Sequence, residues 1–326
     1  MGTGNLHDRI IVFDGLVISN WSRAVFEDMA KGGLSGANCT CSVWEGFEAT
    51  MRNVARWKGW FRDHDDLLLQ AMSVADIRRA KGEGKVAIVL GWQNITAIED
   101  RIEYLALFKA LGVGIMQLAY NTQNLVGSGC YESEDGGLSD FGREVVDEMN
   151  RLGILIDLSH VGSRTSEDAI RHSAQPVCYS HTCPKALRDH PRNKSDEELR
   201  FIAEHGGFVG VTMFPPFLPR GKDSTLEDYL AAIEHTIDVA GEDNVGIGTD
   251  FTQGHGPEFF DWLTHDKGYA RTLVDFGELT YPEGLRRLAE FPNLTAACER
   301  RGWTDERIAK VMGENWLRLL ERVWGA

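Results

Sequence analysis

The chain has 326 residues, of which 43% are hydrophobic and 25% charged, so it is long and apolar enough for one large α/β barrel or for two ordinary domains. Its net charge of −15 argues against binding to nucleic acid or to an anionic membrane, because both require a basic surface. No apolar run approaches the ~20 residues of a membrane helix, and the first ten residues, MGTGNLHDRI, lack the pattern of a secretory signal. We therefore expect a cytoplasmic protein.

Eight short apolar runs alternate with longer amphipathic stretches. In chain order, these candidate strands are residues 10–13, 37–44, 85–91, 114–120, 153–159, 176–180, 207–213 and 244–250. Most of the runs are apolar on both faces, as in parallel strands that helices cover on both sides. Eight strand–helix units predict a (β/α)₈ TIM barrel of the α/β class, which needs about 250 residues. An open doubly wound sheet is the alternative, but no glycine-rich phosphate loop follows an early strand.

The segments between the strands have helical periodicity and helical end signals. The clearest are residues 139–153, 195–207, 226–241 and 304–324. We find no internal repeat and no low-complexity linker, so we expect residues 1–326 to form a single barrel domain. Helices over about residues 283–326 should pack on the outside of that barrel.

The six cysteines do not form a zinc-ribbon or C-x-x-C spacing, and they are too sparse for a disulfide framework. Cys39 and Cys41 lie in the apolar run NCTCSVW. We interpret them as buried free thiols, which indicates a reducing compartment.

Polar side chains follow the predicted strands at the edge where a barrel carries its active site. The strand-end residues are Asp14, Gln93, Tyr120, Asn121, His160, His181 and Asp250. Two buried runs end alike, ILIDLSH at His160 and VCYSH at His181. One histidine after a strand is commonly a hydrogen-bonded structural residue, and an aspartate there can cap the next helix. Two histidines and an aspartate at one mouth would make a zinc-binding set with a position left for water.

The motifs DLSH, YSH and GIGTDF, with DG after the first strand, resemble the membrane (renal) dipeptidase family. The segment GLSDFGREVVDEMNRLGILIDLSHV is similar to the most specific region of that family, and the resemblance covers essentially the whole chain. It implies a (β/α)₈ barrel of the amidohydrolase type. It also implies a two-zinc centre that hydrolyses dipeptides, often with a D-residue on the C-terminal side, in a protein that is often a homodimer.

Four positions match the functional residues of the resembled family. His160 and His181 match the pair that binds one of the two zincs. Asp250 matches the aspartate that handles the proton of the attacking water. Arg192, in DHPRNKSDEEL, matches an arginine that binds the terminal carboxylate of the substrate, a task that suits a bidentate guanidinium.

Other positions depart from the family pattern. The first strand of the family runs into Asp-Gly-His-x-Asp, whose histidine and aspartate bind the other zinc, and here Leu16 and Ile18 stand in their places. The bridging glutamate falls at Gln93, and a neutral amide contributes no charge to offset two dications. A histidine that polarises the scissile carbonyl aligns with Tyr120. The His-x-Asp metal site should therefore be absent.

These matches and losses predict a divergent metallohydrolase that holds one divalent ion, zinc by family, on His160 and His181. Asp250 would act as general base, and Tyr120 would polarise the substrate carbonyl. The substrate would be a small amide or dipeptide-like molecule with a carboxylate, and the aliphatic replacements would enlarge the apolar part of its pocket. Arg192, Gln93 and Asn121 are the predicted substrate-binding residues.

Two other functions remain open on the same residues. A metal-free barrel could carry out a lyase or isomerase step on a carboxylated metabolite, with Asp250, His160 and Tyr120 as acid–base groups. Alternatively, the barrel could be catalytically silent and bind a small ligand or a partner protein.

Overall fold

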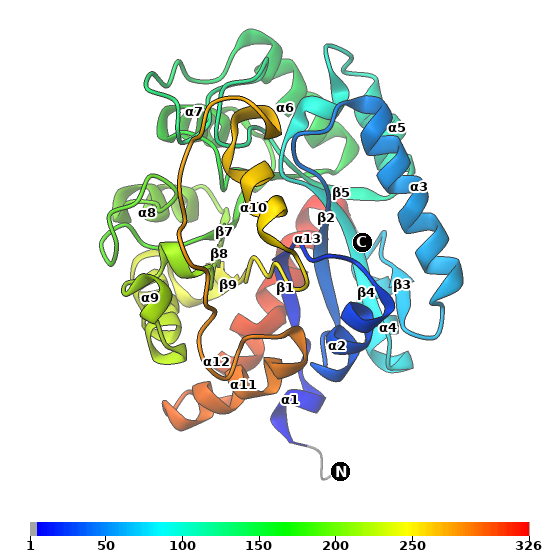
Figure 1. The fold of residues 1–326 in the computed structure, drawn as a ribbon, viewed down its shortest axis with the longest axis vertical. Helices are drawn as coiled ribbons and strands as arrows, with labels where there is room; N and C mark the ends of the chain where they lie inside the picture. Colours follow the sequence, from blue (N-terminus) through cyan, green and yellow to red (C-terminus); the bar gives the residue numbers. More distant parts are fainter. Residues whose placement is uncertain (1–4, 326) are drawn as a thin grey trace.

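The computed structural model describes residues 5–325, and its centre is a barrel of parallel strands (Figure 1). The strands pair in the order β1-β2-β4-β5-β6-β7-β8-β9. Their bounds are β1 Phe13–Val17, β2 Gly36–Ser42, β4 Val86–Trp92, β5 Val113–Gln117, β6 Leu155–Asp157, β7 Cys178–Thr182, β8 Phe208–Val211 and β9 Val245–Ile247. Val17 pairs with Phe251 in a parallel bridge, so the first and last strands meet and nearly close the barrel. The predicted fold class is confirmed.

All eight predicted strands exist, but the first lies later in the chain than residues 10–13. The prediction took Asp14 as the polar residue at the strand end, and this is wrong, because Asp14 is fully buried within β1. Its carboxylate accepts hydrogen bonds from the backbone N–H and the hydroxyl of Thr249 beyond β9. A ninth strand, β3 Leu68–Gln70, pairs with β4 outside the barrel order and was not predicted.

Helices follow the strands and cover the outside of the barrel. They are α2 Arg23–Lys31, α3 Phe47–Asp63, α4 Val74–Glu83, α5 Tyr104–Ala110, α6 Asp140–Leu152, α7 Ser163–His172, α8 Asp196–Glu204 and α9 Leu226–Ala240. The predicted helices at 139–153, 195–207 and 226–241 correspond to α6, α8 and α9. Each begins after a hydroxyl N-cap, namely Ser139, Ser195 and Thr225. No helix within residues 5–325 is long and apolar enough to cross a bilayer.

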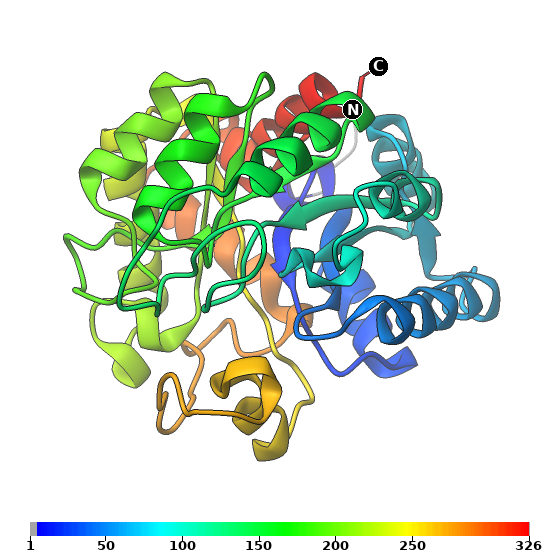
Figure 2. The same cartoon turned by 90° about the horizontal axis from the view of Figure 1, so that it is seen from above.

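The C-terminal helices close the end of the barrel at which the strands begin. The C-terminal segment forms α11 Phe291–Arg300, α12 Asp305–Ala309, a π-helical turn Lys310–Glu314 and α13 Asn315–Trp324. Fully buried Trp316 packs on Phe13 and Phe208, the first residues of β1 and β8, with ring centroids 5.7 and 4.3 Å away. Helix α10, Pro257–Thr264, projects from the opposite side of the molecule (Figure 2). The open end therefore lies at the carboxyl ends of the strands.

Candidate active site

The two predicted histidines meet inside the barrel mouth. His160 follows β6 and His181 lies in β7, and their Nε2 atoms are 2.9 Å apart. Both side chains are buried. The other ring nitrogen of each is also engaged, with His160 Nδ1 2.6 Å from the Asn121 carboxamide oxygen and His181 Nδ1 2.7 Å from the Ser180 hydroxyl.

The hydrogen-bond network behind the histidines determines where their protons lie. The carboxylate of Asp157 accepts the hydroxyl protons of Ser159 and Ser180, each at 2.6 Å. Since the proton of Ser180 points to Asp157, its oxygen accepts from Nδ1–H of His181. The Asn121 oxygen likewise accepts from Nδ1–H of His160. In these tautomers both Nε2 atoms turn their lone pairs towards the same space, an arrangement that a shared cation would stabilise.

Protonation is the weaker way to supply that cation. Burial holds the pKa of His160 and of His181 well below the usual value, and the nearby charge of Arg192 lowers both further. An imidazolium is thus disfavoured at this position. The pair fits a divalent metal, because zinc-binding histidines show the same pattern of Nε2 facing the ion and Nδ1–H bound to an oxygen.

A third ligand does not join the pair. Within residues 5–325, no three His, Cys, Asp or Glu side chains are grouped so that they could hold a metal. The structure thus does not group Asp250, which follows β9, with the two histidines, and the zinc-binding set of all three residues stays a prediction. Any ion on the histidine pair would complete its coordination with water or substrate.

Asp250 is buried at the end of β9 in an uncommon backbone conformation. Its φ is +60°, in the left-handed region that residues other than glycine rarely adopt, and Asn121 shares this feature with φ +62°. Such positions concentrate at functional sites. Burial raises the pKa of the Asp250 carboxyl to about 7, although the charge of Arg192 opposes the rise. The carboxyl is therefore poised to exchange a proton near neutral pH.

Tyr120 covers His160 on the side of the barrel opening. The two rings stack with centroids 4.1 Å apart, and Trp44 meets Tyr120 edge-on at 4.9 Å. Burial raises the pKa of the Tyr120 hydroxyl well above its usual value, so the phenol stays neutral and can donate a hydrogen bond.

The structure gives the predicted substrate-binding residues contacts within the protein. The guanidinium of Arg192 is buried and donates to the backbone carbonyls of Ser159 and His181, the latter at 3.1 Å. Gln93, at the end of β4, donates to the hydroxyl of Thr40 at 3.1 Å. Asn121 orients His160 as described above. Their binding of substrate stays a prediction.

Sequence reasoning missed the residues that orient the histidines. Asp157, Ser159 and Ser180 form a buried polar network between β6 and β7. The motifs DLSH and YSH contain the signal, because each places a serine directly before its histidine.

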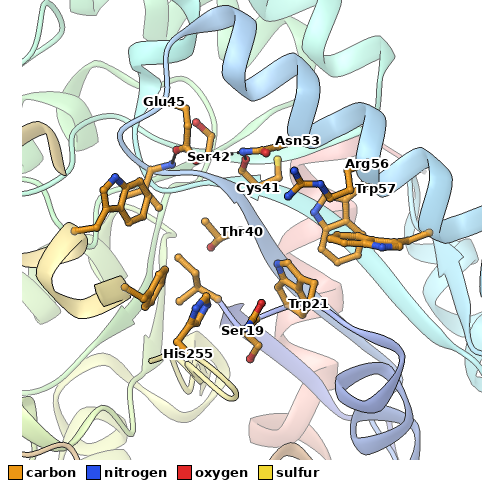
Figure 3. A pocket seen from close by; sticks show the side chains of 16 residues that line it. Ser19, Trp21, Thr40, Cys41, Ser42, Glu45, Asn53, Arg56, Trp57 and His255 are labelled. Atoms are coloured by element: carbon orange, nitrogen blue, oxygen red, sulfur yellow. Dashed lines mark hydrogen bonds between the residues drawn. The ribbon is translucent and has the colours of Figure 1, made fainter. Parts of the chain in front are cut away.

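The β1 side of the mouth is apolar, and the predicted loss of metal ligands at Leu16 and Ile18 stays a prediction. Leu16 is buried within β1, and Ile18 packs with Val43, Tyr120 and Leu263. Beside Ile18 lies a cavity of about 310 Å³ between the ends of β1 and β2, α3 and α10 (Figure 3). Aromatic rings of Trp21, Trp57, Trp60, Phe259 and Trp262 line it. Of the two aliphatic replacements, Ile18 alone borders this cavity.

Comparisons with known proteins agree with this architecture. The model of the membrane dipeptidase family (peptidase family M19) matches residues 19–274 and 272–325, so the match begins just after Ile18. An amidohydrolase from Pseudomonas aeruginosa of known crystal structure is 61% identical, with a TM-score of 0.97 and 98% of each chain covered.

Two curated relatives are fungal proteins. An uncharacterized dipeptidase of Schizosaccharomyces pombe is 32% identical over 74% of this chain and 54% of its own. The dipeptidase tcpJ of Claviceps purpurea is 30% identical over 80% of this chain and 56% of its own. The chain thus spans about half the length of these relatives.

Proposed function

Because the chain belongs to the membrane dipeptidase family, we propose that it is a divergent hydrolase of small amides, dipeptide-like and carrying a carboxylate, that works with a single divalent ion. The proposal depends chiefly on one observation, the two buried Nε2 atoms that face each other at 2.9 Å while both Nδ1 atoms are bound to oxygen. The relatives that carry the word dipeptidase or amidohydrolase in their names support the class of bond that is cleaved.

The residues of this chain would divide the chemistry among themselves. His160 and His181 would hold a zinc-type ion, which when bound supplies a Lewis acid and lowers the pKa of a water molecule towards ~7. Asp250, with its pKa of about 7, would take the proton of the attacking water and return it to the leaving amine. The neutral hydroxyl of Tyr120 would donate to the substrate carbonyl oxygen. The aromatic residues around Tyr120 would exclude bulk water.

A second function has one observation in its favour. With only two grouped ligands among residues 5–325, the acid–base residues could act without metal. Asp250 and Tyr120 would then serve a lyase or isomerase step on a carboxylated metabolite.

Metal content separates the two functions. Protein grown without added zinc should bind one equivalent per chain after exposure to Zn²⁺, and His160→Ala and His181→Ala should each lose it. The same preparation should hydrolyse dipeptides, including L-Xaa-D-Xaa forms, only in the metal-loaded state. Two equivalents per chain would contradict the single-ion proposal. Absence of metal combined with turnover of a carboxylated metabolite that Asp250→Asn abolishes would replace it with the acid–base function.

A further inference from the structure

The 310 Å³ cavity beside Ile18 has the size and lining of a ligand pocket, since such pockets begin at about 300 Å³ and are largely aromatic and apolar. The hydroxyl-bearing residues Ser19, Thr40 and Ser42 line it together with the five aromatic residues named above (Figure 3). Aromatic rings in a lining offer their faces and edges to another ring. The cavity therefore suits an aromatic side chain.

One cation on the cavity wall is free to bind a ligand. Arg56, on α3, is exposed and forms neither a hydrogen bond nor an ion pair with any residue in 5–325, and it lies beside Trp57 and Asn53 (Figure 3). Arg52 and Arg62 on the same helix behave differently, because they pair with Glu48 and Asp63. A guanidinium at a cavity without an internal partner favours an anionic group on the ligand.

The other titratable groups of the cavity do not pair with Arg56. Glu45 supplies a negative charge among the described lining residues, but its oxygens accept hydrogen bonds from the N–H of Val43 at 2.7 Å and from the Asn53 amide at 3.2 Å, and within residues 5–325 it forms no ion pair with Arg56. Burial lowers the pKa of His255 to about 4, so this imidazole is neutral. The thiol of Cys41 is also neutral, because burial raises its pKa well above the usual value.

Packed side chains connect the cavity to the histidine pair. Ile18, Val43, Phe259 and Trp262 line the cavity and also pack in the cluster that contains Tyr120. Tyr120 in turn stacks on His160. Two layers of side chains therefore lie between the cavity and His160, first these lining residues and then Tyr120.

We propose that this cavity binds the C-terminal residue of the substrate, that this residue is aromatic, and that Arg56 pairs with its carboxylate. The scissile amide would extend over Ile18 towards Tyr120. This assignment rests on the proposed function, and it gives Arg56 the anion-binding task because both terminal nitrogens of the Arg192 guanidinium donate to backbone carbonyls, which leaves its buried Nε as the nitrogen without a partner among residues 5–325. The substrates would be N-acylated aromatic amino acids, including dipeptides with an aromatic C-terminal residue.

Calorimetric titration of the full chain tests the assignment, with the protein kept free of metal so that the probes are not hydrolysed. The probes are N-acetylphenylalanine in both enantiomers, N-acetylalanine and N-acetylphenylalaninamide. One enantiomer of N-acetylphenylalanine should bind at least about tenfold more tightly than N-acetylalanine, since a buried phenyl ring contributes the difference. It should also bind about tenfold more tightly than the amide, which lacks the charge that pairs with Arg56.

Variants then identify the cavity as the place of binding. Arg56→Gln should weaken the binding of N-acetylphenylalanine about tenfold and leave the affinity for N-acetylphenylalaninamide unchanged. Arg52→Gln, with the same loss of charge one turn earlier on α3, should bind like the wild type. Phe259→Ala should weaken the binding of N-acetylphenylalanine and of its amide to the same extent. A melting curve of this variant serves as the control that it folds.

The outcomes distinguish this assignment from the proposed function. Equal binding of all probes, or identical effects of Arg56→Gln and Arg52→Gln, would overturn the assignment even if dipeptides are hydrolysed. The predicted pattern of binding, found in protein that hydrolyses none of the dipeptides, would uphold the cavity and reject the hydrolase.

Discussion

The two sides of the barrel mouth differ in polarity. On the β6–β7 side, His160 and His181 are each oriented by an oxygen acceptor, and the buried carboxylate of Asp157 supports the network. On the β1–β2 side, Leu16 and Ile18 are buried aliphatic residues, and the space next to Ile18 is walled by aromatic rings. One side is suited to a cation and the other to an apolar group.

The difference has a physical basis. A buried carboxylate or imidazole needs partners, and a set of metal ligands without its metal would leave charges unpaired. The aliphatic side chains of Leu16 and Ile18 carry no such cost, and Ile18 packs with Val43 and Leu263. The hydroxyl groups of Ser159 and Ser180 bind Asp157 without any residue of β1.

The strongest way to break the comparison is to remove one imidazole. His181→Ala should abolish binding of the single metal equivalent and lower kcat/KM on the order of 10⁴-fold or more, because both the ion and the positioned water are lost. Metal analysis and a dipeptide assay on the same preparation measure the two effects. His265→Ala, which removes an imidazole from the exposed loop after α10, is the matched control. Retained metal in His181→Ala would place the ion elsewhere.

Asp250→Asn tests the proton-transfer residue between the two sides. It should lower kcat about 10²–10³-fold while metal content stays at one equivalent, because the amide cannot accept the proton of water. The acidic limb of the wild-type rate profile should lie near pH 7, where the carboxyl ionises. A variant with the wild-type profile would exclude Asp250 as the base.

Stability gives the same residue a second readout with a definite sign. Burial raises the pKa of Asp250 from 3.8 to about 7, so between these values the folded state binds a proton that the unfolded state has lost. The free energy of unfolding contributed by this group therefore falls as pH rises through that window. Asparagine does not titrate, so the stability of Asp250→Asn relative to the wild type should rise as the pH increases from about 4 to about 7 in urea denaturation. A constant difference would contradict the raised pKa.

Ile18→Asp sharpens the comparison by placing a carboxylate on the apolar side. It should lower the free energy of unfolding by about 2–5 kcal/mol, since the charge is buried beside Val43 and Tyr120 without a partner. Ile18→Val, which removes one methylene, should cost about 1 kcal/mol. Urea denaturation measures both. A stable Ile18→Asp protein that takes up a second metal equivalent would show that β1 still supports the ligand geometry of the family.

The sequence predicted those features that depend on neighbouring residues or on strand order. The eight apolar runs indicated the strands, and the carboxyl ends of parallel strands meet at one edge, so the approach of His160 to His181 followed. The position of β1 did not follow, because Asp14 and Gly15 resemble a turn. The burial of Asp14 depends on Thr249, which is 235 residues away in the chain.

The cavity also could not be predicted from the sequence. Its lining comes partly from α3 and α10, and nothing in the sequence brings Trp57 and Phe259, 202 residues apart, to one cavity. Residues in the motifs could have revealed more, since a serine precedes each histidine and both serines bind Asp157.

The smallest expected effect tests how the polar side holds its cation. Ser180→Ala removes the acceptor of His181 Nδ1–H and one donor to Asp157, so the imidazole loses its fixed tautomer and orientation. Loss of such a partner typically costs ten- to about a hundredfold in metal affinity. Competition with a chelator measures this affinity. Ser166→Ala removes a buried hydroxyl that forms no hydrogen bond within the described part of the chain, and it should keep wild-type affinity. Equal metal affinities of Ser180→Ala and Ser166→Ala would mean that the β6–β7 network serves folding alone. The two Nε2 lone pairs that face each other would then need another explanation than a bound metal.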